Sequence, residues 1–88
     1  MEIREKTFAV LSGLSGMKTI GPKQTLQGDL GLDSLKMVTL LILLEENFRI
    51  TLDESDMNPF DLVNVRQVVD LVEKYAGGGK YEENAKED

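Results

Sequence analysis

The sequence predicts a single all-α domain, a bundle of three longer helices and one short helix with a long loop after the first helix. Three segments repeat apolar residues at steps of three and four, the period of an amphipathic helix. Glycine and proline separate these segments. A chain of 88 residues with 41% hydrophobic content supplies one small core and leaves no room for a second domain.

Residues 2–14 are predicted to form the first helix. Its apolar stripe consists of Ile3, Thr7, Val10, Leu11 and Leu14. Gly16 and the pair Gly21-Pro22 then interrupt helix formation, so residues 15–33 are predicted to form a loop. A loop of this length in a compact domain needs anchors. We expect three leucines to anchor it: Leu26, Leu30 and Leu32.

The second helix is predicted to begin at Ser34, with Asp33 as the N-cap whose carboxylate accepts first-turn N–H groups. Its core-facing residues are expected to be Val38, Leu41, Ile42 and Phe48, and Leu35 either joins them or belongs to a surface that partners contact. Glu45 and Glu46 fall near the C-terminal end, where the helix dipole disfavours acids. Their presence suggests either a role beyond helix stability or simply a solvated helix end.

Residues 50–64 mix turn-forming and apolar residues, and Pro59 limits any helix there to a turn or two, so a short third helix is predicted. Asn64 is the predicted N-cap of the last helix, which ends before Gly77. The stripe of this helix consists of Val65, Val68, Val69, Val72 and Tyr75. Residues 1–76 are thus the predicted domain, and residues 77–88 are predicted to be a disordered acidic tail.

Composition argues against several classes of function. The chain has no cysteine and no histidine, which removes the commonest nucleophile, general base and zinc ligands. We therefore expect no catalytic residue and no metal site. The formal net charge of −6 argues against nucleic acid and favours a partner with a basic patch. The N-terminus is no secretory signal, and the longest apolar stretch has five residues, which is too short to span a membrane. A cytoplasmic location is expected.

The segment Gly31-Leu32-Asp33-Ser34-Leu35 resembles the Gly-x-Asp-Ser-Leu attachment motif of acyl carrier proteins, and the helix pattern of residues 2–76 is similar to theirs. The resemblance implies a four-helix acyl-carrier bundle that is not an enzyme. A phosphopantetheinyl transferase would move 4′-phosphopantetheine from coenzyme A to Ser34, with Asp33 near the magnesium ion of the transferase. The arm would carry acyl thioesters for fatty-acid, polyketide or related dedicated biosynthesis. Its partners would be acyl-activating, synthase or acyltransferase enzymes, and we expect a free-standing monomer.

Simple electrostatics supports an arm at Ser34, because the free N–H groups and partial positive charge of a helix N-terminus stabilise a phosphate. The second helix departs from the pattern of fatty-acid carriers, which place acids along its exposed face. This chain has Lys36, Met37, Thr39 and Leu40 there, so docking through apolar contacts as much as through basic patches is expected. The predicted partner surface consists of Leu35, Lys36, Met37, Leu40 and Glu45.

Three other functions are compatible with parts of the sequence. An aminoacyl carrier of the D-alanyl or peptidyl type stays possible, although Leu32 stands where peptidyl carriers usually have glycine. A small helical adaptor without a prosthetic group would use Asp33 and Ser34 only as a helix cap. A calcium-binding loop starting at Asp53 is disfavoured, because Asn58 and Asn64 occupy the positions that require glycine and glutamate.

Overall fold

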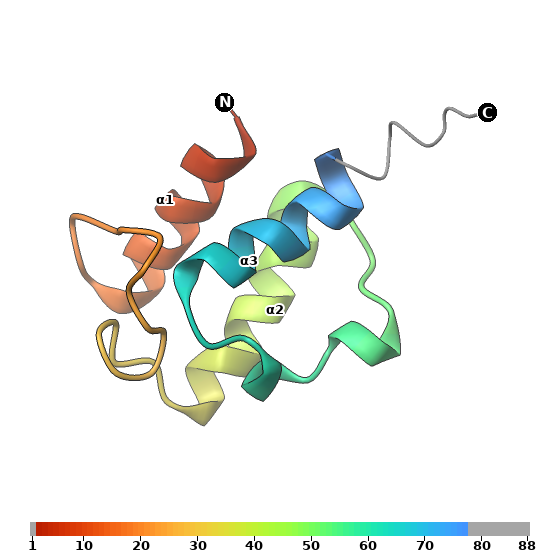
Figure 1. The fold of residues 1–88 in the computed structure, drawn as a ribbon. Coiled ribbons are helices and arrows are strands. Elements are labelled where there is room, and N and C mark those ends of the chain that lie inside the picture. The colour runs from red at the N-terminus through yellow and green to blue at the C-terminus, as the bar shows by residue number, and fades with distance from the viewer. Residues whose placement is uncertain (1, 78–88) are drawn as a thin grey trace.

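A computed structural model describes residues 2–77, whose regular structure is helical (Figure 1). In chain order the elements are α1 (Ile3–Ser15), α2 (Ser34–Phe48), the 3-10 turns η1 (Glu54–Asp56) and η2 (Pro59–Asp61), α3 (Val65–Val72) and the π-helical end η3 (Glu73–Gly77). The predicted all-α bundle is confirmed, and its short third helix consists of two separate turns. Of the predicted tail, residues 77–88, only Gly77 is described, as the last residue of η3, and the remainder lies outside the described residues.

The three α-helices pack around one core. α1 contacts both α2 and α3, and in Figure 1 α2 passes behind α3. The N-caps predicted for the later helices are confirmed: Asp33 caps α2, and Asn64 forms a capping box with Gln67 at the start of α3. The core consists of Leu11, Ile20, Leu26, Leu30, Leu32, Met37, Leu40, Leu41, Leu44, Leu52, Val65, Val68 and Val72.

The first loop is held by side chains and by its backbone. The three leucines expected to anchor it are buried, as predicted. In addition, the N–H of Leu26 donates to the carbonyl of Val63 at 2.9 Å, and the N–H of Val65 donates to the carbonyl of Gln24 at 2.9 Å. These bonds place the loop along the segment that leads into α3 (Figure 1). The sequence pattern did not reveal them, because backbone pairing depends on which distant segments meet.

The inward face of α2 differs from the predicted one. Met37 and Leu40, expected on a partner surface, are fully buried together with Leu41 and Leu44. Val38 and Ile42, expected in the core, are each 47% exposed. Both predictions were wrong for one reason: almost every residue of this helix segment is apolar, so two different stripes satisfy the helical period. The neighbours α1 and η2 decide which stripe is buried.

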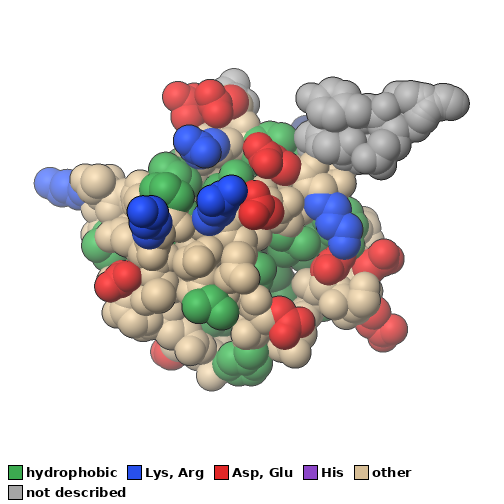
Figure 2. All heavy atoms as spheres, viewed as in Figure 1, with side chains coloured by type: hydrophobic (Ala, Val, Ile, Leu, Met, Phe, Trp, Pro, Cys, Tyr) green, Lys and Arg blue, Asp and Glu red, His purple; other side chains and the backbone are tan. Residues whose placement is uncertain are grey.

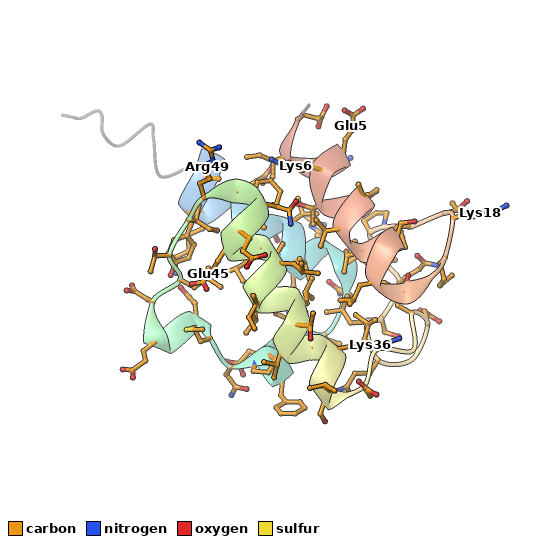
Figure 3. All side chains as sticks on the ribbon, turned by 180° about the vertical axis from the view of Figure 1, so that it is seen from behind. Glu5, Lys6, Lys18, Lys36, Glu45 and Arg49 are labelled. Carbon is orange, nitrogen blue, oxygen red and sulfur yellow. The ribbon has the colours of Figure 1, made fainter. Side chains whose placement is uncertain are left out.

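Glu45 has an internal role near the end of α2. Its Oε2 atom accepts the backbone N–H of Leu52 at 2.9 Å, so the carboxylate holds the start of the second loop, residues 49–64, against the helix. Figure 3 shows Glu45 on the side of α2 that faces this loop. Glu45 therefore has a role beyond helix stability, which is the first of the two explanations given above for acids at this end of the helix.

A second anchor joins the second loop to η3. The hydroxyl of Tyr75 accepts the N–H of Asp53 at 2.9 Å and donates to the carboxylate of Asp56, which also pairs with Lys74 at 2.9 Å. The Tyr75 hydroxyl and then the Lys74 ammonium lower the pKa of Asp56, and the same hydrogen bond to Asp56 raises the pKa of Tyr75. Figure 2 shows acidic side chains beside a basic one at this edge of the molecule.

Thr7 of α1 provides a stability prediction. Its side chain is fully buried, and within residues 2–77 its Oγ1 atom has no hydrogen-bond partner. An unpartnered buried hydroxyl costs about 1–3 kcal/mol, and valine has nearly the same shape. Thr7→Val is therefore expected to raise the free energy of unfolding by about 1 kcal/mol or more in urea titrations. Thr51→Val, at an exposed position, is the control and should change little. A less stable Thr7→Val variant would mean that the hydroxyl is bonded.

Candidate functional site

Ser34 is the first residue of α2, and its side chain is exposed. Asp33 satisfies two of the nearby N–H groups: its Oδ1 atom accepts the N–H of Lys36 at 2.9 Å, and its carbonyl accepts the N–H of Met37 at 2.9 Å. The N–H groups of Ser34 and Leu35 have no acceptor within the helix, because the first turn of an α-helix lacks a preceding turn. The Ser34 hydroxyl thus stands beside two backbone donors.

The end of the first loop fixes the position of Ser34. Leu30 and Leu32 are both buried, and Gly31 between them has a φ of 70°, a left-handed conformation that favours glycine. The N–H of Leu32 donates to the carbonyl of Leu26 at 3.0 Å, which ties the segment back to the loop. The two leucines therefore anchor the chain immediately before the exposed serine. This geometry explains the glycine of the motif, which the sequence pattern alone did not.

The electrostatic surroundings of Ser34 suit an anion. The N-terminus of α2 carries the positive end of the helix dipole, and the exposed Lys36 extends from the first turn (Figure 3). The carboxylate of Asp33 already accepts a backbone N–H. A phosphodiester on the Ser34 oxygen therefore fits the available donors. Within residues 2–77, no group of acidic side chains has the arrangement of a metal site.

The comparisons with known proteins identify the family. The family described as "Phosphopantetheine attachment site" matches residues 7–72, which include the Ser34 site and all three α-helices in whole or in large part. The chain belongs to this family. Its members carry 4′-phosphopantetheine, so this group is the prosthetic group of the domain, and the expectation drawn from the motif is confirmed.

A solved structure supports the same assignment. The chain is similar to a structure assigned to an acyl carrier protein of Mycobacterium tuberculosis, with 29% identity and a TM-score of 0.72. The match covers 81% of this chain and 95% of the other. No curated protein sequence matches the chain. Within the part of the chain that is described, no helix has the length and apolar character needed to cross a membrane.

The structure brings together only part of the predicted partner surface of this carrier domain. Leu35 and Lys36 are exposed beside Ser34, whereas Met37 and Leu40 lie in the core. The exposed apolar residues that we missed are Val38, Ile42, Met57, Phe60 and Val63. A pattern in the sequence could have identified the two missed residues of α2, Val38 and Ile42. The buried stripe stays apolar from Met37 to Phe48, whereas the stripe through Val38 and Ile42 meets Glu46 after one more turn.

Proposed function

We propose that Ser34 carries the phosphopantetheine arm and that the chain transports acyl groups as thioesters without catalysing a reaction. The observation that carries the proposal is an exposed hydroxyl beside two backbone donors at a capped helix N-terminus, within the segment matched to the family. The phosphodiester would be held by the N–H groups of Ser34 and Leu35. Asp33 keeps the first turn of α2 in place.

The chain's own chemistry in this role is limited to attachment and presentation. When bound, the arm supplies the thiol that forms the thioester. The protein has no cysteine, so no second thiol competes for the acyl group. The core leucines before Ser34 hold the attachment point rigidly, while the arm can move between partners. The reactions themselves belong to the partner enzymes.

The proposal is tested by intact-mass measurement after incubation with coenzyme A and a broad-specificity phosphopantetheinyl transferase. We expect the mass of one phosphopantetheine to be added, and fragmentation of the tryptic peptide that contains Ser34 to locate it there. Absence of any addition to the folded protein, or location of the arm on another residue, would overturn the proposal. A helical adaptor without a prosthetic group predicts no addition.

We further propose an acyl cargo for fatty-acid, polyketide or related dedicated biosynthesis. Leu32 before Asp33 and the likeness to an acyl carrier protein support it. Incubation of the holo protein with acyl-activating enzymes and with D-alanine- or amino-acid-activating enzymes separates the candidates. Loading by only an aminoacyl-activating enzyme would contradict the acyl cargo and leave the carrier function intact.

The partner surface proposed from the structure lies on α2 and the second loop. We define the apolar docking face as six exposed residues: Leu35, Val38, Ile42, Met57, Phe60 and Val63. Their exposed fractions range from 39% to 75%. α2 contacts η2, so the elements that carry most of this face are neighbours, and hydrophobic side chains are visible where η2 lies (Figure 2). Exposed apolar patches of this kind mark protein interfaces. Acids are concentrated beside it, because residues 50–64 hold four acids and no basic residue.

This surface predicts a loss of loading when it is made polar. The double variant Val38→Glu/Ile42→Glu is expected to lower kcat/KM for loading by about 10- to 100-fold, because interface centres exclude charge. The measurement is the loading rate of the holo protein by an acyl-activating enzyme that accepts the wild type. Ala9→Glu/Thr19→Glu is the control, since it adds the same charge at exposed residues of α1 and the first loop, outside the face. Equal loading of the double variant and the wild type would contradict this surface.

A further inference from the structure

An open groove lies between α1 and α2, outside the attachment motif and outside the apolar docking face. Its volume is about 340 Å³, more than any single side chain occupies, so several side chains of a partner fit in it. The groove is mostly apolar, and its half-buried lining includes Val10 and Leu14 of α1 and Leu43 of α2. From Lys6 to Leu14 the α1 side extends for about 12 Å, a little over two helical turns.

Gly13 leaves the α1 side of this groove open. It lies inside a helix, where glycine is the weakest helix former apart from proline. Its backbone is not in the left-handed conformation, and a Cβ atom there would have no neighbouring atom within 4 Å. Neither backbone geometry nor packing within residues 2–77 therefore requires glycine at this position. The missing side chain does allow another backbone to approach α1 closely.

Basic side chains lie toward both ends of the groove. At one end, the Lys6 ammonium lies 5.1 Å from the centre of the Phe48 ring, so a cation–π contact holds it beside the end of α2. Among residues 2–77, no acidic side chain lies within ion-pair distance of Lys6. Toward the other end, Lys36 is exposed two turns before Leu43 on the same face of α2. Figure 3 shows Lys6 near the C-terminal end of α2 and Lys36 near its N-terminal end.

We propose that this groove binds an amphipathic helix of a partner protein that carries acidic residues at both ends of its apolar stripe. The space between two packed helices receives the side-chain ridge of a third helix, and the apolar lining matches such a stripe. The two lysines complement the acids and set the orientation of the helix.

The groove differs in charge from the rest of the molecule. The chain as a whole has a net charge of −6, and acids are concentrated beside the apolar docking face. The groove and the docking face share no residue, although α2 contributes to both. An acidic partner in the groove and an enzyme at the docking face would therefore contact different residues. The proposal does not depend on the attachment at Ser34.

The test is a titration of the apo protein with two synthetic peptides, followed in amide spectra by nuclear magnetic resonance. One peptide consists of alanine, leucine and glutamate, with leucines three and four residues apart and glutamates at both ends. The other has lysine in place of each glutamate. We expect the acidic peptide to shift residues 6–14, Leu43 and Asn47, and to bind about 10-fold or more tightly than the basic one. Equal affinities, or shifts confined to the apolar docking face, would overturn the proposal.

Two variants test the shape and the charge of the groove separately. Gly13→Leu places a side chain in the open space and should lower the affinity for the acidic peptide about 10-fold or more, whereas Gln27→Leu, exposed in the first loop, should not. Lys6→Glu should weaken binding of the acidic peptide and strengthen binding of the basic one, and Lys23→Glu, exposed outside the groove, is its control. A loss of stability alone cannot produce this exchange of preference, so an unchanged preference in Lys6→Glu would contradict the proposal.

Two further variants separate the groove from the carrier function. Ser34→Ala should bind the acidic peptide as the wild type does, because Ser34 lies outside the groove. Ala9→Glu/Thr19→Glu, the control for loading, has its first change in the groove and should bind this peptide more weakly while loading is unchanged. Full binding by that variant would contradict the groove and leave the proposed function intact.

Other occupants of the groove give different results in the same spectra. Larger shifts of the groove residues with laurate than with the acidic peptide would indicate a lipid and overturn the proposal. Shifts of these residues on dilution of the protein alone would assign the groove to a second copy. Shifts on removal of residues 80–88 would assign it to the C-terminal segment. Either result would likewise contradict an acidic helix of a partner.

Discussion

Ser34→Ala is expected to abolish attachment of the arm completely while leaving the fold unchanged. The hydroxyl oxygen is the atom that forms the bond to phosphorus, and alanine offers no substitute. The helix should persist, because Asp33 keeps its cap hydrogen bond to the N–H of Lys36 and alanine is a good helix former. Intact-mass measurement with coenzyme A and the transferase should therefore show no addition to a variant whose circular dichroism spectrum matches the wild type.

A matched serine makes this result specific. Ser55 lies in η1 and is exposed like Ser34, but it has neither the helix N-terminus nor the motif. Ser55→Ala is expected to accept one arm at the wild-type rate. Addition of an arm to Ser34→Ala would place the attachment elsewhere and contradict the proposed function.

Leu40→Glu is expected to unfold the protein, whereas Ile42→Glu is expected to fold. Leu40 is fully buried at the centre of the core, so glutamate there would place a charge in an apolar surrounding at a cost of several kcal/mol. Small domains have a total stability of about 5–15 kcal/mol, and one of this size is at the lower end. Ile42 is 47% exposed, and its glutamate can reach water. The two variants place the same charge two residues apart on one helix.

Circular dichroism and urea titration measure this contrast. We expect the helical signal of Leu40→Glu to be lost or its urea midpoint to fall steeply, and Ile42→Glu to stay close to the wild type. A stable Leu40→Glu with an unstable Ile42→Glu would reverse the assignment of the two faces of α2. That outcome would restore the surface expected from the sequence and remove the apolar docking face.

Local signals in the sequence were strong enough to define the elements and the proposed attachment site. Capping residues at Asp33 and Asn64 and the interruptions by glycine and proline determined where α2 and α3 begin. These signals act over three or four residues, so they can be read without knowledge of distant contacts. The exposure of Ser34 followed from the same argument, since the first residue of a capped helix need not face the core.

Other features depended on which distant segments meet. The two apolar stripes of α2 differ in the sequence only where the stripe through Val38 and Ile42 reaches Glu46, because Met37 and Val38 are equally able to fill a core. Packing against α1 and η2 buried the first and left the second exposed. The backbone hydrogen bond between Leu26 and Val63 likewise joins two loops that are far apart in the sequence.

The sequence by itself therefore determined the helices, the cap and the serine to which the arm is proposed to bind, because hydrogen bonds within one turn decide these features. Only the tertiary structure decided which apolar residues are free to contact a partner. An apolar side chain lowers the free energy whether it is buried in the core or against a partner. The shape of the surrounding elements determines which of these two positions is available to it.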